Sequence, residues 1–312
     1  MENNQKQIEL EKKLDELEAI QKKENPIGFA VIVREFKKDK LASFSLYVLL
    51  AFFAFVYIAS MFINTEALNT VDIFRKYDPP SFKNIWDIFG RDSGGRSVLG
   101  LLIVGARNSI TIGIAITIIT STIGLISGLC MGFYGGKVDS YIMRVVDFIG
   151  VLPTLMIIIS FVSMAKTYNV FTLIGVMSVF YWTGTARLVR SKALSESRRD
   201  YVSASKTMGT SDIKIMLRGI LPNISSILIV DGTLTLAANI GIETALSYLG
   251  FGLPISVPSI GTLISLASKP EIIQSKMYVW LPAALTLLLM MLSINYIGQA
   301  LRRASDARQR LG

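Results

Sequence analysis

Long apolar stretches alternate with shorter polar ones along this chain, and their lengths give the first information about its fold. A helix that crosses the roughly 30 Å apolar core of a bilayer needs about 20 apolar residues. The windows of the sequence that meet this requirement are 41–63, 109–134, 143–164, 170–188, 224–249 and 279–301. We therefore predict an all-α integral membrane protein with six transmembrane helices.

Composition and charge agree with a membrane protein and predict its orientation. Hydrophobic residues make up 51% of the 312 residues, which is unlike an ordinary soluble domain. Most Lys and Arg residues fall on one side of the predicted helices, and basic residues collect on the cytoplasmic side. We therefore expect a multi-pass protein of the plasma membrane with both termini in the cytoplasm. The net charge of +9 favours membrane lipid as a partner, and its scatter over the connections argues against nucleic acid.

Histidine and cysteine usage narrows the chemistry that this chain can perform. The chain has no histidine, so His-ligated metal sites and Ser-His-Asp triads are excluded. Its single cysteine, Cys130, lies in an apolar window and cannot form a disulfide framework within one chain. We expect Cys130 to be a packing residue and the chain to hold no metal and no cofactor of its own.

Residues 1–40 form a charged segment that precedes the spanning domain of residues 41–312. Its first part alternates Lys and Glu around leucines at helical spacing, which indicates an exposed helix or short coiled coil, or a solvated tail. These leucines are Leu10, Leu14 and Leu17. Further on, apolar residues share one helical face beside several lysines, a pattern typical of a helix on the inner membrane surface. They are Phe29, Ile32, Val33 and Phe36.

Glycines recur every four residues in the second apolar window, at Gly124, Gly128, Gly132 and Gly136. This spacing gives a ridge of bare backbone on one helical face, against which another helix can pack closely. We interpret the ridge as a packing surface, with a gating role as the alternative.

Ionisable residues in the apolar windows are candidate functional sites, because a charge inside the bilayer is costly. Arg144 and Asp147 are three residues apart, so we predict a local ion pair between them. Asp231 lies close enough to the inner end of its helix to reach water. A polar series near the outer end of the same helix contains Asn239, Glu243, Thr244 and Ser247. We assign this series to the translocation pathway or a subunit contact, with snorkelling of Glu243 as the alternative.

Two segments, 64–107 and 250–278, are expected on the extracytoplasmic side, and proline and glycine punctuate both of them. Apolar residues lie between the predicted turns. Because irregular backbone at membrane depth must be covered by protein or water, we predict short helices that lie in or re-enter the outer membrane surface.

A polar segment at about 190–222 separates two apolar windows on the cytoplasmic side. Its first helical face contains Tyr201, Ala204 and Met208. Gly209 follows, and glycine readily adopts the positive φ with which many helices end. We therefore predict a turn at Gly209 between two cytoplasmic helices.

The second helix of this segment has a polar start and an apolar stripe. Ser211 or Asp212 can cap it, and Pro222 is expected to end it before the next span begins. The stripe has i, i+3, i+4, i+7 spacing and consists of Ile213, Met216, Leu217 and Ile220. A short amphipathic helix-turn-helix of this kind is suited to a groove in another protein.

Several motifs resemble one family of transporters. "SASKTMG" at 203–209, followed by Leu221 and Pro222, is similar to the EAA signature of ABC importer permeases, although Ser203 and Ser205 depart from its Glu and second Ala. The stretches "FGRDSGGRSVLGLLIVGARNSI", "YGGKVDSYIMRVVDFIGVLP", "WTGTARLVR", "LSYLGFGLP" and "ASDAR" resemble, in the same order, the oligopeptide and dipeptide permease family. The charged N-terminal extension and the closing tail are similar to its C-type subunit.

The resemblance implies a bacterial peptide importer in which this chain is not the catalyst. It implies a heterodimer with a homologous B-type permease, two cytoplasmic ATPase subunits that bind ATP and Mg, and an extracytoplasmic binding protein that delivers peptide. The residues implied to couple the permease to the ATPases are Ser203, Ala204, Ser205, Gly209, Ile213, Met216, Leu217, Leu221 and Pro222. Dipeptide, nickel or glutathione cargo, and a secondary transporter without ATPases, are the alternatives.

Overall fold

The computed structural model of the chain describes residues 34, 36–165, 168–254 and 256–311. The predicted leucine helix at residues 10–17 lies outside the described residues. The predicted interfacial helix also lies outside them, except at its end, where Phe36 is buried in the main apolar core.

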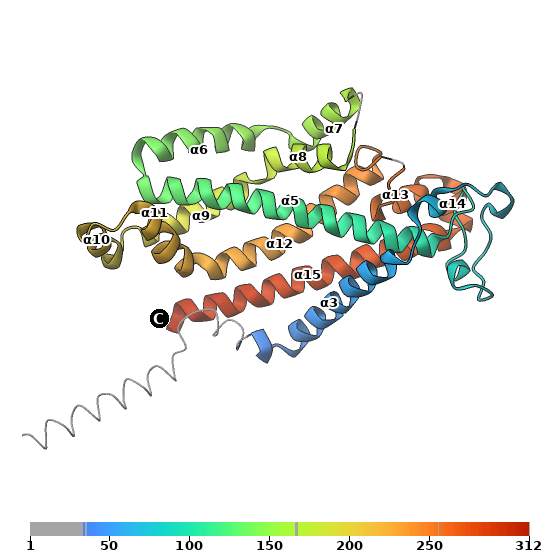
Figure 1. The fold of residues 1–312 in the computed structure, drawn as a ribbon, viewed down its shortest axis with the longest axis horizontal. Coiled ribbons are helices and arrows are strands. Elements are labelled where there is room, and N and C mark those ends of the chain that lie inside the picture. The colour runs from blue at the N-terminus through green and yellow to red at the C-terminus, as the bar shows by residue number, and fades with distance from the viewer. Residues whose placement is uncertain (1–33, 35, 166–167, 255, 312) are drawn as a thin grey trace, which may run out of the picture.

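The described chain is an elongated bundle of roughly parallel and antiparallel helices (Figure 1). Its helices are α3 (Lys40–Met61), α4 (Thr65–Asn69), η1 (Ile73–Arg75), η2 (Ile85–Asp87), α5 (Val98–Tyr134), α6 (Gly136–Val151), α7 (Thr154–Met164), α8 (Val170–Tyr181), α9 (Thr183–Glu196), α10 (Asp200–Thr207), α11 (Asp212–Ile215), the π-helical turn η3 (Met216–Ile220), α12 (Leu221–Tyr248), α13 (Ile260–Ser265), η4 (Leu266–Ser268), α14 (Pro270–Ser275) and α15 (Met277–Leu311).

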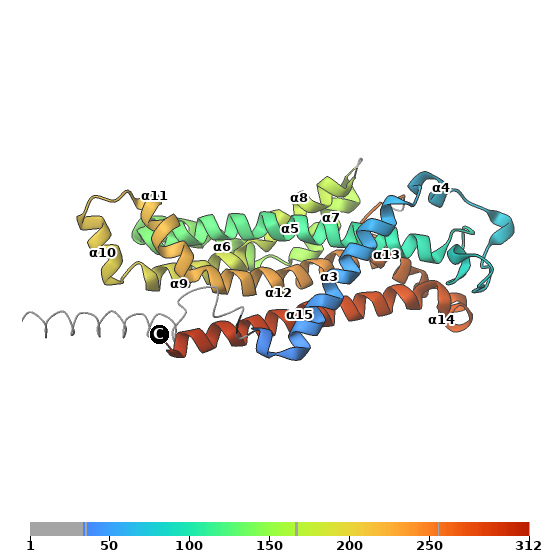
Figure 2. The same cartoon turned by 60° about the horizontal axis from the view of Figure 1, so that its bottom comes forward.

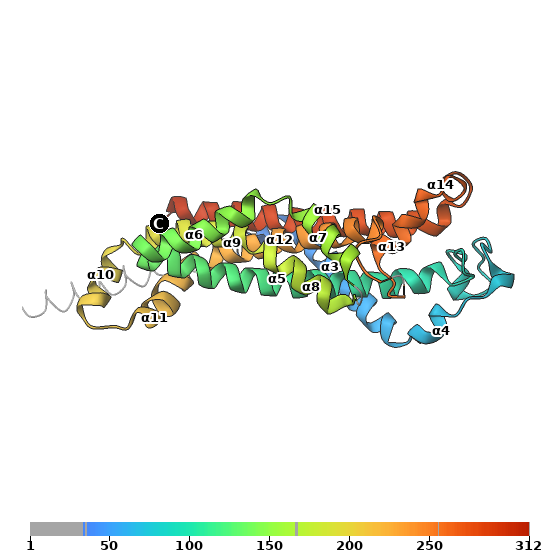
Figure 3. The ribbon, with the colours of Figure 1, turned by 90° about the horizontal axis from the view of Figure 1, so that it is seen from above.

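Different elements lie at the two ends of the bundle. In all three views, α10 and α11 lie at one end, which we call the hairpin end (Figures 1, 2 and 3). The short helix α14 lies at the opposite end, which we call the loop end, together with the segment that precedes α5. The predicted short helices of 64–107 and 250–278 are therefore present, as α4, η1 and η2 in the first segment and α13, η4 and α14 in the second.

Among the described residues, four helices are long and apolar enough to cross a membrane. They are α3, α5, the continuous helix 212–248 and α15. The predicted span 143–164 is instead α6 and α7, which meet at an angle of 76° and bring the number of spans to five if the pair counts as one. Pro153 explains the bend, because proline disfavours helical backbone at the residue before it. The predicted span 170–188 is divided between α8 and α9 at Trp182, so the sixth span stays a prediction.

The second span starts earlier than its hydrophobicity indicates. Helix α5 begins at Val98 rather than near residue 109 and is 37 residues long. The Ser97 hydroxyl accepts a hydrogen bond from the Gly100 N–H at 3.2 Å. This side-chain cap satisfies a backbone donor of the first turn, and the helix therefore begins in the punctuated segment.

The glycine ridge of α5 is a packing surface, as predicted. A Cβ atom at its first three glycines would lie only 2.5–2.7 Å from side-chain atoms of α9. The opposed pairs are Gly124 with Thr185, Gly128 with Val189 and Gly132 with Ala193. Gly136 is the exception, because it starts α6 with φ of 51° and nothing lies within 4 Å of its Cβ position.

Ion pairs join α6 to α9, and they replace the local pair predicted within α6. Asp147 accepts a hydrogen bond from the Arg187 guanidinium of α9 at 3.0 Å. The predicted Arg144–Asp147 pair is therefore wrong. Arg190, one turn further along α9, binds Asp139 through Nη2 at 2.6 Å. The approach of two helices supplied partners that the spacing within one helix did not reveal.

Candidate functional site

The hairpin formed by α10, Gly209 and α11 is the first candidate site. Gly209 has φ of 76°, so the predicted turn between two helices is confirmed. Ser211 occupies the N-cap position of α11, but its side chain accepts no hydrogen bond from the helix. The predicted side-chain cap at Ser211 is therefore absent, and the turn rests on the glycine.

The apolar stripe predicted on the second helix is divided between two surfaces. Ile213 and Leu217 are 64% and 53% exposed, whereas Met216 and Ile220 are buried against the rest of the chain. Met216 and Ile220 lie in the apolar cluster with Leu129 of α5 and Val189 of α9, and Ile213 and Leu217 lie outside it. A π-helical turn spans 216–220, where the Leu221 N–H donates to the Met216 carbonyl. Part of the stripe therefore packs on this chain, and only Ile213 and Leu217 are left exposed for a partner.

Three apolar side chains of the hairpin face away from the chain, and we call them the hairpin patch. They are Met208, Ile213 and Leu217, and each is more than half exposed. Met208 comes from the C-cap of α10 and the other two follow Gly209. The turn therefore brings apolar residues from both arms to one end of the bundle.

The hairpin is anchored to the bundle by buried apolar side chains and by a cation–π contact. Val202 and Ile215 pack in a cluster with Leu129 of α5 and Val189 of α9. In addition, Lys206 lies 4.3 Å from the centre of the Phe133 ring, a distance at which a cation is attracted to an aromatic face. Movement of the hairpin is therefore coupled mechanically to α5 and α9.

A polar cluster at the base of the hairpin was not identified in the sequence. The Tyr201 hydroxyl donates to Glu196 at 3.0 Å, and the Asn223 amide donates to the Tyr201 hydroxyl at 3.2 Å. Burial raises the pKa of Tyr201, so its hydroxyl stays protonated and available as a donor. These residues join the ends of α9, α10 and α12. Their separation in sequence left no local signal for the cluster.

The remaining residues implied to couple to ATPases lie at the hairpin or its base. Ser203 and Ala204 are exposed on α10, and the Ser205 hydroxyl donates to the Tyr201 carbonyl at 2.8 Å. Leu221 is half-buried, and exposed Pro222 lies in the first turn of α12.

Pro222 does not end a helix, contrary to the prediction. The helix continues from residue 212 to residue 248. Proline is tolerated at this position because the widened π turn before it already interrupts the regular α-helical hydrogen bonds.

The buried carboxyl group of Glu243 is the second candidate site. Glu243 is fully buried and accepts a hydrogen bond from the Ser247 hydroxyl at 2.7 Å, while the Thr244 hydroxyl lies at 3.5 Å. The buried Ser109 of α5 lies beside this carboxyl, and its hydroxyl accepts a hydrogen bond from the Ile260 N–H at 3.3 Å. The prediction that Glu243 faces protein or water rather than lipid is therefore confirmed.

Hydrogen bonds extend this polar series along α12 and into the loop end. Ser247 accepts a hydrogen bond from the Leu253 N–H at 3.1 Å, and the Asn239 amide donates to the Thr117 hydroxyl of α5 at 2.9 Å. Asn239, Thr244 and Ser247 are all buried within this chain. The series thus fixes α12 against α5 and against the segment after α12. Direct contact with cargo or another subunit stays a prediction.

Asp231 in the first half of α12 has a partner within the bundle. The Thr185 hydroxyl of α9 donates to its carboxyl group at 2.7 Å. Asp231 therefore has a hydrogen-bond partner on a neighbouring helix. Its access to water stays a prediction.

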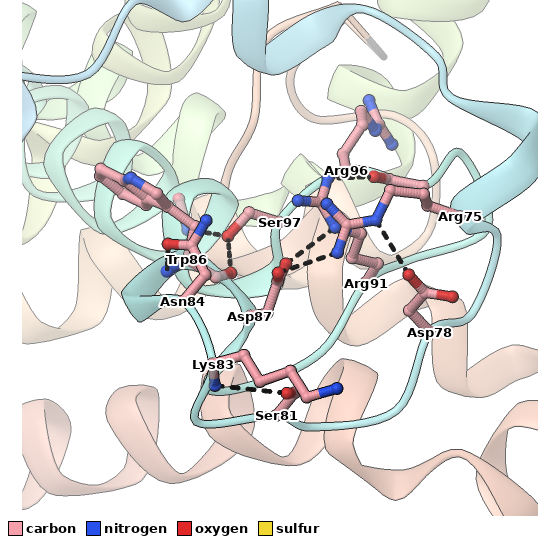
Figure 4. A network of polar contacts seen from close by, with 12 residues as sticks. Arg75, Asp78, Ser81, Lys83, Asn84, Trp86, Asp87, Arg91, Arg96 and Ser97 are labelled. Atoms are coloured by element: carbon pink, nitrogen blue, oxygen red, sulfur yellow. Dashed lines mark hydrogen bonds and ion pairs between the residues drawn. The ribbon is translucent and has the colours of Figure 1, made fainter.

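The loop end contains a network of ion pairs that was also not identified in the sequence (Figure 4). Arg75 and Arg91 each donate to one oxygen of the Asp87 carboxylate, both at 2.8 Å. Arg75 also binds Asp78 at 3.0 Å. Burial tends to raise the pKa of Asp87, but the two arginines outweigh burial and the pKa is lowered. A charged carboxylate therefore holds the folded segment before α5 together.

Comparison with known proteins places the chain in a family. Residues 121–311 match the model of the binding-protein-dependent transport system inner membrane component. The oligopeptide transport system permease protein OppC of Lactococcus lactis subsp. lactis (strain IL1403) is 47% identical over 278 residues, which cover 89% of this chain and 94% of that protein. OppC of Bacillus subtilis (strain 168) is 34% identical and covers 88% of each chain. The chain therefore belongs to the family of binding-protein-dependent transport inner membrane components.

A solved structure supports the same fold. A chain of the MetNI methionine ABC transporter, in an inward-facing conformation, superposes with a TM-score of 0.54 and 18% identity. The match covers 66% of this chain and 97% of the MetNI chain. The fold is therefore that of an ABC importer permease, an all-α membrane protein. The family consists of transport components, so this chain is a permease and not an enzyme.

Proposed function

We propose that this chain is the C-type permease subunit of an ABC importer for oligopeptides in a bacterial plasma membrane, with both termini in the cytoplasm. Oligopeptide cargo is supported by the names of the similar permeases from L. lactis, B. subtilis and Streptococcus pneumoniae. Their alignments extend over nearly nine tenths of this chain.

In this proposal the chain acts together with other subunits. A homologous B-type permease forms the other half of the pathway, an extracytoplasmic binding protein delivers peptide, and two ATPase subunits bind ATP and Mg²⁺. The chemistry of hydrolysis belongs to the ATPases. The role of this chain is to convert their movement into alternating access of the pathway to the two sides of the membrane.

The observation that carries the proposal is the exposed hairpin patch on an anchored hairpin. Met208, Ile213 and Leu217 are exposed apolar side chains of the hairpin, and its helices α10 and α11 lie at one end of the bundle (Figure 1). Burying each of them fully against a partner would contribute roughly 1.5–3 kcal/mol. Because the residues between them pack on α5 and α9, a partner that moves the patch also moves these helices. We assign the patch to the ATPase contact.

Substitution of the patch tests the coupling role. Leu217→Asp, in the assembled importer, is expected to reduce ATPase co-purification or peptide-stimulated ATP hydrolysis about tenfold or more, because an apolar contact is lost and a charge is buried. Peptide uptake into vesicles should fall in parallel. Lys214→Gln is the matched control, since Lys214 is exposed on α11, three residues before Leu217, and is outside the patch.

Two results would contradict the proposal. One is normal peptide uptake by Leu217→Asp with the ATPases still bound. The other is uptake by the unaltered protein that follows an ion gradient and needs no ATP, which would favour a secondary transporter.

A further inference from the structure

A cavity of about 560 Å³ lies among α3, α5, α12 and α15, on the side of the bundle where α3 begins. This volume is in the range of pockets that hold small organic molecules, about 300–1,000 Å³. Buried Leu49 and Ile294 form part of its wall. Tyr47 and Ile118, also in its wall, are 68% and 61% exposed. The cavity therefore opens sideways, toward the surface that the spanning helices present to lipid.

The charge at the mouth of the cavity has one sign. Among the described residues that line it, Lys37 alone carries a charge, and it is exposed just before α3 begins. Lys40 is exposed one turn further on. The acid between them, Asp39, is paired with Arg303 at 2.8 Å and caps α3 through the Ala42 N–H. The rim is therefore positively charged while the interior is apolar.

A buried hydroxyl without a partner lies between the charged rim and the apolar interior. Within the part of the chain that the structure describes, the Ser43 hydroxyl is buried and has no hydrogen-bond partner. Ser43 lines the cavity in the first turn of α3. A buried donor without a partner is unfavourable, and an acceptor from outside the chain would satisfy it.

We propose that this cavity binds one anionic phospholipid. Its acyl chain lies along the apolar wall, its phosphate lies at Lys37, and one of its ester oxygens accepts a hydrogen bond from Ser43. A phospholipid presents these groups in the same order from surface to interior: an anion, then ester acceptors, then hydrocarbon. The site is separate from the hairpin patch, so the inference does not depend on the proposed ATPase contact.

Gly232 offers a way to fill the cavity without distorting the helix. It lines the cavity on α12, and nothing lies within 4 Å of the position where its Cβ would be. Gly232→Phe therefore places a ring in the space assigned to the acyl chain. Gly175→Phe is the matched control, because Gly175 of α8 has equally open space and lies outside the cavity.

The test is native mass spectrometry of the assembled importer titrated with phosphatidylglycerol or with phosphatidylcholine. The unaltered protein and Gly175→Phe are expected to retain one more phosphatidylglycerol than Gly232→Phe does. Equal retention by all three proteins would overturn the proposal. Loss of assembly with another subunit on Gly232→Phe, with lipid retention unchanged, would also overturn it and assign the cavity to a helix of that subunit.

Substitution of the rim separates headgroup binding from simple hydrophobic filling. Lys37→Gln is expected to lower the preference for phosphatidylglycerol over phosphatidylcholine about fivefold, the effect of one basic residue near an anionic lipid surface. Lys137→Gln removes an exposed charge from the start of α6, outside the cavity, and should leave the preference unchanged. An unchanged preference in Lys37→Gln would overturn the assignment of the phosphate.

Discussion

The hairpin end and the loop end of the bundle both expose apolar side chains. The two ends are held in place by different interactions. At the loop end, Asp87 is fixed by two arginines and is itself nearly buried. At the hairpin end, Val202 and Ile215 are buried in an apolar cluster. The segment around Asp87 is thus held by ion pairs, whereas Val202 and Ile215 hold the hairpin by apolar packing.

This difference bears on what each end can transmit. Close packing resists small displacements, because neighbouring side chains lose contact or collide. A hairpin packed on α5 and α9 therefore passes movement to them. An ionic segment at the opposite end instead keeps its shape as long as its carboxylates stay charged. A substitution at one end should consequently change the local stability of that end and leave the other end unaffected.

The largest expected effect on stability is at the ionic end. Asp87→Ala should lower the local free energy of unfolding by about 3 kcal/mol, because Arg75 and Arg91 lose their shared partner in a nearly buried site. Faster hydrogen–deuterium exchange over residues 77–97 would measure it. Asp78→Ala is the control, since this more exposed partner of Arg75 should contribute about 1 kcal/mol or less. Equal effects of the two variants would contradict an ionic core at Asp87.

A smaller effect is expected at the hairpin turn. Gly209→Val forces a branched side chain into a backbone with φ of 76° and should destabilise the hairpin by about 1–2 kcal/mol. Exchange should rise over residues 200–215 and transport should weaken, while membrane insertion stays normal. Gly209→Asn should behave much more like the unaltered protein, because Asn tolerates positive φ. Normal exchange in the valine variant would contradict the requirement for a residue that tolerates positive φ at this turn.

The most gradual effect is that of pH. The two arginines keep the pKa of Asp87 below its usual value despite burial, so the stability it provides is present above the unfolded pKa of about 3.9. This stability is lost as the pH falls through the lower folded pKa. Acid should loosen residues 77–97 before residues 200–215, because the hairpin is held mainly by the apolar cluster that contains Val202 and Ile215, and this cluster has no ionisable group to protonate. Exchange corrected for the intrinsic effect of pH would measure the order, and simultaneous loosening would contradict it.

Much of the spanning core could be predicted from hydrophobicity alone. The first and last spans agree with α3 and α15 to within a few residues at their apolar parts, because about 20 apolar residues have few stable alternatives to a helix in a bilayer. The glycine ridge was also predictable, since spacing places small residues on one helical face. The bend between α6 and α7 was not predicted, because apolar residues continue through it and hydrophobicity does not record direction.

The candidate site was predicted less completely. The position of the hairpin and the turn at Gly209 followed from local backbone preferences. The division of the stripe into exposed Leu217 and buried Met216 did not, because the packing of the hairpin on α5 and α9 decides which part of an apolar face is covered. The Asp87 network was missed because Arg75 lies twelve residues away from the carboxylate that it binds.

The sequence by itself determined the membrane environment, the apolar helices, the turn at Gly209 and the family resemblance. These features depend on short-range backbone preferences and on the transfer of apolar side chains from water. Only the tertiary structure decided that Asp147 pairs with Arg187 rather than Arg144, and that Ser43 lies in a cavity of four helices. Partners of this kind are set by the distance between helices, and a linear pattern of residues does not contain that distance.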